Sequence, residues 1–283
     1  MTQHMASDAR LAKLLADIES CHSARLPGTR LALHAGAHHI GYLKPELAER
    51  LRGIEPAISL SLGRAEMPEA LLPRLNELAQ ATGLRNRAED FDVRARVGGP
   101  VLGVLDRGAL PDFGVIGVGV HLNGLVRKPD GLHVWVAKRA ANKKLDPGKL
   151  DHLVAGGVPA GHTPFAALLK EAGEEAGLDE AWAAKAREVA RFRYNMDRPE
   201  GLRRDAIYAY DLELPDDFTP KPMDGEVESF SLWPLAAVKE ALCTGDDFKF
   251  NVVLVLLDLL LRQGLFAPAA AELLKSALYR DVI

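Results

Sequence analysis

The chain has 283 residues, 48% of them hydrophobic, and a formal net charge of −4, which is typical of a globular protein with two modest domains or one large one. A net charge this close to neutral gives no general attraction to nucleic acid or to an anionic membrane, so we expect neither as a partner. Two cysteines in a chain of this length indicate no disulfide framework and fit a reducing compartment, so we expect a cytoplasmic protein.

The apolar segments do not have the pattern of a signal peptide or of a membrane span. Asp8, Lys13 and Asp17 interrupt the apolar residues near the N-terminus, where a signal peptide would have an unbroken apolar core. The most apolar run, residues 252–261, contains Asp258 and is too short to cross a bilayer. It predicts a buried helix.

Residues 7–110 have the pattern of one small unit that contains both helices and strands. Leu11, Leu14, Leu15 and Ile18 recur at helical spacing. The segments that follow predict strands over 30–34 and 39–43, helices over 45–52 and 68–81, and strands over 92–97 and 101–105. We therefore predict an α+β domain over residues 1–110 and a second domain over residues 111–283.

Three histidines, His34, His38 and His39, lie around the first predicted hairpin. On a hairpin, alternate side chains point to opposite faces, and no cysteine or carboxylate joins this group. We interpret them as surface or packed histidines rather than as a metal site.

From about residue 113 the sequence changes to a long β pattern that is punctuated by glycines. Gly117 and Gly119 resemble the start of a dinucleotide-binding loop, but Leu122 occupies the place of its third glycine. We therefore reject a dinucleotide site. A turn at residues 129–131 leads into a predicted strand over 132–139, which forms a hairpin with the first strand.

The second strand of that hairpin has a basic end. Lys138 and Arg139 close the strand, and Lys143 and Lys144 follow within a few residues. Cationic side chains of this kind bind phosphate groups, but they are equally typical of a solvated basic loop. Both interpretations stay open at this level.

A glycine-rich loop then leads into one short helix. Thr163 is a good N-cap, Pro164 suits the first helical position, and Gly177 can adopt the left-handed conformation that ends a helix. These capping signals predict a helix over residues 164–176.

The last turns of this helix are crowded with carboxylates. Glu171, Glu174 and Glu175 are three and four residues apart, so they project from neighbouring positions on the helix surface and repel one another. They also lie near the C-terminal end, where the helix dipole disfavours anions. Oxygen ligands in this arrangement suit Mg²⁺ or Mn²⁺, although three glutamates alone favour a solvated acidic helix end.

The rest of the chain alternates between strand and helix patterns. A helical segment over 181–190 precedes strands over 188–196 and 205–214, a strand that contains Trp233, and helices over 235–242 and 250–263.

The spacing around the carboxylates resembles the Nudix box. Seven residues fall on its pattern: Gly156, Glu171, Ala172, Glu174, Glu175, Gly177 and Leu178. His162 stands where the family has a glutamate, and Lys170 where it has an arginine, and these two usually form a supporting ion pair. The resemblance implies a Nudix α/β/α sandwich with a mixed sheet, preceded here by the small α+β domain.

The resemblance also implies roles for individual residues. Glu171 would be a metal ligand and the orienting group or base, Glu174 and Glu175 would be ligands, and the Gly156 carbonyl would add a further oxygen. Lys170 would support Glu171, and His162 is either tolerated or assists a proton transfer.

A further carboxylate after the box commonly completes the metal shell in this family. Glu226 is our candidate, although Glu228 points the same way in an extended segment. For the substrate we expect contacts from Lys138, Arg139, His121 and Tyr208.

Four segments are similar to a narrower branch, the one associated with thiamin pyrophosphokinase, whose members carry an extra N-terminal domain. They span residues 119–124, 150–157, 208–215 and 218–228. This likeness implies Mg²⁺-dependent hydrolysis (Mn²⁺ also fits) of thiamin diphosphate, or of its oxidised, damaged forms, to the monophosphate. The expected partner is thus a small diphosphate, and the expected assembly is a monomer or a homodimer.

Three other functions compete with this one. A Nudix pyrophosphatase acting on a nucleoside diphosphate derivative such as ADP-ribose has the same box. A non-hydrolytic sensor of diphosphate ligands would fit the changes at His162 and Lys170, but it has no need for three costly glutamates. An isopentenyl diphosphate isomerase needs a pocket cysteine, and Cys21 and Cys243 lie far from the box in sequence.

Overall fold

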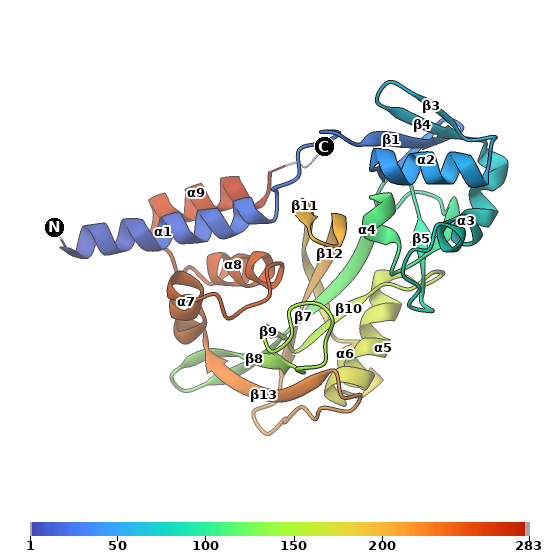
Figure 1. The fold of residues 1–283 in the computed structure, drawn as a ribbon. Coiled ribbons are helices and arrows are strands. Elements are labelled where there is room, and N and C mark those ends of the chain that lie inside the picture. Colours follow the sequence, from blue (N-terminus) through green and yellow to red (C-terminus); the bar gives the residue numbers. More distant parts are fainter. Residues whose placement is uncertain (1, 281–283) are drawn as a thin grey trace.

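The computed structural model describes residues 2–280, with side chains from residue 8 onward. A small sheet with its helices lies beside a larger sheet that is covered by helices on both faces (Figure 1). The predicted mixed α/β fold, with a small α+β unit before the sandwich, is confirmed. In the described part of the chain, no helix is both long and apolar enough to cross a membrane.

The smaller sheet has the strand order β2-β1-β4-β3, with β1 and β4 parallel. Its strands are β1 (Leu31–Ala35), β2 (His38–Leu43), β3 (Ser59–Ser61) and β4 (Arg64–Met67). The helices α2 (Pro45–Ile54) and α3 (Leu75–Ala81) contribute Leu51, Leu75 and Leu78 to its core. The helix predicted over 68–81 is interrupted, because Pro73 lies inside a 3₁₀ segment, η1 (Glu69–Arg74), before α3 begins.

A short ribbon connects this unit to the larger sheet. Its strands are β5 (Asp90–Val93) and β6 (Gly103–Asp106), which pair antiparallel. They are shorter than the predicted strands over 92–97 and 101–105. The helix α4 (Leu110–Phe113) follows, and Gly114 at φ +54° turns the chain into the larger sheet.

The larger sheet is mixed, with the order β11-β12-β7-β8-β13. Its long strands are β7 (Ile116–Lys128), β8 (Gly131–Arg139), β11 (Arg187–Arg198), β12 (Gly201–Leu214) and β13 (Val227–Pro234). The pair β7–β12 is parallel and the other pairs are antiparallel. Two short strands that the sequence did not predict, β9 (Leu150–His152) and β10 (Val154–Gly157), pair with β8 and β7.

Alternate residues of the strands face two different cores. Ile207 and Ala209 belong to the core under the C-terminal helices, whereas Tyr208 and Tyr210 belong to the core under α5. The first core is covered by α7 (Leu235–Thr244), α8 (Val252–Arg262) and α9 (Pro268–Leu278), and the second by α5 (Pro164–Ala176) and α6 (Glu180–Ala183). Figure 1 shows the two groups on opposite sides of the sheet.

The helices differ from expectation in detail. All residues from 252 to 261 are buried, as predicted for the apolar run. The helical segment predicted over 181–190 is shorter, because α6 ends at Ala183 and β11 begins at Arg187. The sequence did not predict α9.

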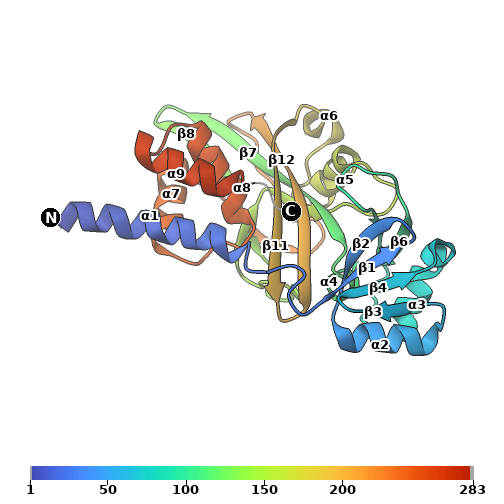
Figure 2. The same ribbon diagram turned by 90° about the horizontal axis from the view of Figure 1, so that it is seen from above.

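The N-terminal helix, α1 (Thr2–Ser20), packs far from the small sheet that follows it in sequence (Figure 2). Its residues Leu14 and Ile18, with Cys21, are buried in the core of the C-terminal helices. This packing differs from the expectation that residues 7–110 form one unit, because an amphipathic helix does not reveal which core it will cover. The domain division at residue 110 stays a prediction.

Candidate active site

The box helix is built as its capping signals predicted. Thr163 Oγ1 accepts a hydrogen bond from the Ala166 N–H at 3.1 Å, and α5 begins at Pro164. At the other end Gly177 adopts φ +62°, and its N–H donates to the Gly173 carbonyl. The helix therefore holds its carboxylates at fixed positions beside the sheet.

Glu175 is buried, with 6% of its surface exposed. Its carboxylate accepts a hydrogen bond from the Ala155 N–H at 2.8 Å, which ties it to β10. Burial raises the pKa of Glu175 to about 8, although this hydrogen bond acts in the opposite direction. Within the described residues no lysine, arginine or histidine forms an ion pair with it, and a buried carboxylate without such a partner is costly when ionised.

Glu171 lies one helical turn earlier and lines a cavity. Burial raises its pKa to about 7, and the neighbouring Glu174 adds to the shift while Lys170 opposes it. Gly156 on β10 packs directly against this side chain, since a Cβ at position 156 would lie 2.4 Å from Glu171 Cδ. The glycine of the box is therefore required by the close approach of the glutamate.

Residues before β13 complete the acidic group. Carboxylate oxygens of Glu175, Asp224 and Glu226 lie within 4.8 Å of one another. Glu226 forms an ion pair with Lys143, and the Glu226 N–H donates to Asp224 Oδ1 at 2.8 Å. Asp224 was not predicted; the signal for it was its place in the same short acidic segment, two residues before Glu226.

The structure distinguishes between the two candidate ligands Glu226 and Glu228. A bulge between Val227 and Ser229 shifts the register against β8. Glu228 consequently pairs with Lys138 at 2.8 Å and is exposed, whereas Glu226 lines the cavity.

The donor set fits a hard divalent cation. Glu171, Glu175, Asp224 and Glu226 offer carboxylate oxygens, the ligand type that Mg²⁺ and Mn²⁺ prefer. A cation would also compensate the buried charge of Glu175. Glu174 is exposed and pairs with Lys170 at 2.6 Å, so it lies at the edge of this group.

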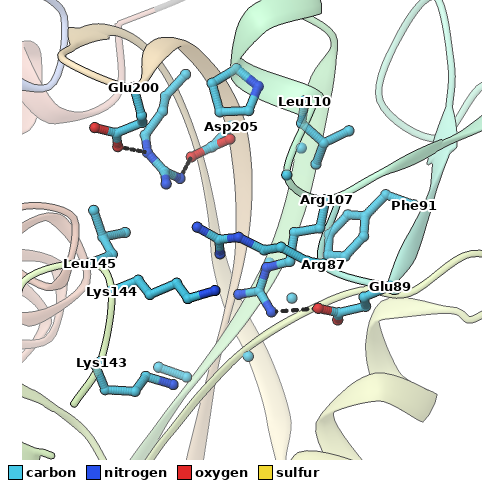
Figure 3. A pocket seen from close by; sticks show the side chains of 18 of the residues that line it. Arg87, Glu89, Phe91, Arg107, Leu110, Lys143, Lys144, Leu145, Glu200 and Asp205 are labelled. Carbon is cyan, nitrogen blue, oxygen red and sulfur yellow. Dashed lines mark hydrogen bonds and ion pairs between the residues drawn. The ribbon is translucent and has the colours of Figure 1, made fainter. Parts of the chain in front are cut away.

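The acidic group borders a cavity of about 980 Å³ between the small N-terminal unit and the larger sheet. Its lining is rich in cationic side chains from both parts of the chain (Figure 3). These are Arg85, Arg87, Arg107, Arg139, Lys143, Lys144, Arg198, Arg203 and Lys249. Carboxylates that attract a cation and cations that attract phosphates therefore share one space.

The residues expected to bind the substrate divide into two groups. Arg139 and His121 line the cavity, whereas Lys138 and Tyr208 do not. Lys138 is exposed beside Glu228, and Tyr208 is buried in the core under α5 with the Arg191 guanidinium 4.7 Å from its ring.

Arg139 and His121 belong to a buried polar group. Arg139 donates to Asp151 at 2.7 Å, and His121 Nδ1 lies 2.8 Å from His152 Nδ1. Burial lowers the pKa of His121 well below its usual value, so this imidazole is neutral. Asp151 also faces Lys249 at 3.5 Å, so Arg139 and Lys249 already compensate the carboxylate that a metal would share with His121 and His152.

Comparison with known proteins identifies the central part of the chain. Residues 119–252 match the family model described as the NUDIX domain. The chain carries a Nudix domain.

Named relatives agree with this assignment. The chain is 43% identical over 189 residues to Nudix hydrolase 20, chloroplastic, and 41% identical over 187 residues to Nudix hydrolase 24, chloroplastic, both from Arabidopsis thaliana. The alignments cover 67% and 66% of this chain, which spans about half the length of each relative. A crystal structure of a Deinococcus radiodurans protein aligns over 68% of this chain and 100% of its own, with 22% identity and a TM-score of 0.44.

The loop of the Nudix box is held by the small N-terminal unit, which the sequence did not reveal. The Ala160 N–H donates to the Asp90 carbonyl at 2.7 Å, and the Gly161 N–H donates to Asp92 Oδ1 at 3.2 Å. The Phe91 ring packs on Gly157, where a Cβ would lie 2.5 Å from the ring. The strand β5 therefore supports the loop directly.

The two departures from the box pattern have separate surroundings. His162 is exposed, with its Nδ1 3.1 Å from the Ala160 carbonyl oxygen. Lys170 bonds to Glu174, although its charge also lowers the pKa of Glu171. The expected support of Glu171 by Lys170 is thus electrostatic, without a hydrogen bond in the structure.

Proposed function

We propose that this chain hydrolyses a diphosphate linkage with the help of Mg²⁺, or Mn²⁺, held by Glu171, Glu175, Asp224, Glu226 and the Gly156 carbonyl, with Glu174 at the edge. The observation that carries the proposal is the buried carboxylate of Glu175, which has no cationic partner among the described residues, beside a cavity lined by cationic side chains. A site for neutral ligands would need neither a buried carboxylate nor a cationic lining. The carboxylates would hold a cation, and the cationic side chains would bind the phosphates on which that cation acts.

The bound cation would neutralise phosphate oxygens and hold the reacting groups in line. Glu171 is the group that we propose to orient the attacking water or to accept its proton, because it is the carboxylate of α5 that lines the cavity. Glu175 is kept in place by the Ala155 N–H. Lys143 and Arg139 line the same cavity and would favour the phosphate end of a substrate.

Thiamin diphosphate, or its oxidised forms, is the substrate that we propose. The support is the likeness of residues 150–157 and 218–228 to the branch associated with thiamin pyrophosphokinase. A cytoplasmic location is likewise our proposal, while the two Arabidopsis relatives are described as chloroplastic.

The test is phosphate release from a panel of substrates, with Mg²⁺, with Mn²⁺ and with EDTA. The panel contains thiamin diphosphate, oxidised thiamin diphosphates, ADP-ribose and nucleoside triphosphates. Turnover that needs the cation and favours the thiamin compounds supports the proposal. Turnover of ADP-ribose alone favours the nucleotide pyrophosphatase, and no turnover of any compound favours the sensor.

A further inference from the structure

Arg87 is held at the cavity by a rigid loop of the small N-terminal unit. The buried Asp106 carboxylate accepts hydrogen bonds from the backbone N–H groups of Arg87 (2.9 and 3.0 Å), Glu89 (3.2 Å) and Gly108 (2.7 Å). Position 108 must be glycine, because a Cβ there would lie 2.5 Å from the Arg85 carbonyl oxygen. Charge-assisted bonds to three backbone groups fix the loop before any ligand arrives.

The Arg87 side chain has no counter-ion in the described part of the chain. Its Nε is buried and lacks a hydrogen-bond partner there, and none of the described carboxylates forms an ion pair with its guanidinium. Figure 3 shows the guanidinium directed into the cavity, toward the Lys144 side chain from the loop after β8. Burial and the nearby Arg107, Arg85 and Arg203 lower the pKa of Arg87, whereas the Asp106 carboxylate, which is bonded to the backbone of the loop, acts in the opposite direction.

The carboxylates around Arg87 are already engaged. Glu89 pairs with Arg107 at 2.8 Å, and Glu200 and Asp205 pair with Arg203 at 3.1 and 3.3 Å. Arg87 and Lys144 both line the cavity, and neither forms an ion pair with any of the described carboxylates, so an anion from outside the chain would find two free cationic side chains there.

The position of Arg107 connects this space to the reaction site. Arg107 lies beside Arg87 and lowers the pKa of both Glu171 and Glu226, so its charge acts on both groups. An anion between Arg87 and Lys144 would thus lie in the same cavity as the acidic group, on the side formed by the N-terminal unit.

We propose that Arg87 and Lys144 bind the terminal phosphate of the substrate, so that the chain selects diphosphates with a free terminal phosphate over those esterified at both ends. The Arg87 guanidinium and the Lys144 ammonium would each bind free oxygens of the phosphate, and a terminal phosphate has three such oxygens. An ester on that phosphate leaves two free oxygens instead of three and takes away one negative charge. This inference rests on the proposed function and refines its substrate class.

The first test compares R87Q, R87K and K144Q with R64Q, a control in the same unit whose arginine pairs with Glu66 away from the cavity. With thiamin diphosphate, or whichever terminal diphosphate the wild type hydrolyses best, R87Q and K144Q are expected to raise KM about tenfold. R87K should recover part of the loss, and R64Q should behave as wild type. An unchanged KM in a folded R87Q protein overturns the proposal.

The second test uses binding without turnover, so that it stays informative if hydrolysis is not observed. The probes are ADP and ADP-ribose, which differ in whether the terminal phosphate is esterified, together with inorganic pyrophosphate, all measured by calorimetry in EDTA. R87Q should weaken binding of ADP and pyrophosphate about tenfold and that of ADP-ribose much less. Equal losses for ADP and ADP-ribose, or no loss for either, contradict the terminal-phosphate subsite. Absence of hydrolysis by the wild type contradicts the proposed function instead.

Discussion

The box helix and the small N-terminal unit face the same cavity with opposite charges. The helix side presents Glu171, with Glu175 buried behind it, whereas the N-terminal side presents Arg87 and Arg107. The carboxylates follow from one helical spacing. The position of Arg87 depends on Asp106, which binds the backbone of a loop 17 to 19 residues away in sequence. The carboxylate side can be predicted from local sequence, whereas the cationic side depends on tertiary contacts.

The largest effect is expected on the carboxylate side, from Glu175→Gln. A glutamine keeps the hydrogen bond from the Ala155 N–H but removes the charge that would hold a cation. Mg²⁺-dependent hydrolysis should fall by about a hundredfold or more, measured as phosphate release at saturating Mg²⁺.

Glu272→Gln is the matched control, because Glu272 is an exposed residue of α9 outside the cavity. It should leave the rate unchanged. Near-normal turnover by the Glu175→Gln protein would contradict the metal assignment, and its melting temperature shows whether the fold has survived.

The same carboxylates predict how the stability of the metal-free protein depends on pH. Burial raises the pKa of Glu175 to about 8 and that of Glu171 to about 7, from 4.5 for an ordinary glutamate. The unfolded chain therefore releases these protons first, and the folded protein loses stability as the pH rises from about 4.5 to about 8. Thermal melting in EDTA should show this decline.

Adding Mg²⁺ should reverse the decline most strongly near pH 8, since the cation stabilises the ionised carboxylates. Glu175→Gln should flatten the pH dependence in EDTA. A melting temperature in EDTA that rises from pH 5 to pH 8 would contradict the uncompensated charge at this position.

The contact between the two sides is tested by Gly157→Ala. The new Cβ would lie 2.5 Å from the Phe91 ring, so β5 or the box loop must move. We expect a loss of about 1–3 kcal/mol in the free energy of unfolding, as for other overpacked sites, together with a lower kcat. Denaturant unfolding and kinetics measure the two effects.

Phe91→Leu provides the complementary variant. If the steric contact is the cause, the double variant should be less destabilised than the sum of the two single variants. Strict additivity would mean that Gly157 is needed for a reason other than the Phe91 ring.

The difference between the two sides also explains what sequence reasoning could reach. The bounds of α5 followed from Thr163, Pro164 and Gly177, because capping is a local property. The packing of α1 was missed because any apolar core can cover its apolar face. The short strands β9 and β10 lack a long enough alternating pattern to be recognised.

Within the site, long-range contacts likewise limit what the sequence can predict. Glu226 and Glu228 could not be separated by alternation, because a bulge at Val227 breaks it. Arg87 carried no signal at all, since its proposed role depends on Asp106 and on the lack of an ion pair with any described carboxylate. Residues that act through a local motif can be predicted, and residues that act through contacts between distant segments need the structure.

The smallest effect is expected where the box departs from its family, at His162 and Lys170. His162 is exposed, Lys170 already pairs with Glu174, and the loop is held by Asp90 and Asp92. The combined change His162→Glu with Lys170→Arg should preserve or raise kcat/KM, within about twofold of the wild type. A drop of tenfold or more would mean that His162 has its own role in the reaction. If β5 provides the support that the family obtains from its ion pair, Asp92→Ala should weaken that support, because the loop loses the Gly161 hydrogen bond. The same double change should then raise kcat/KM more in the Asp92→Ala background than in the wild type.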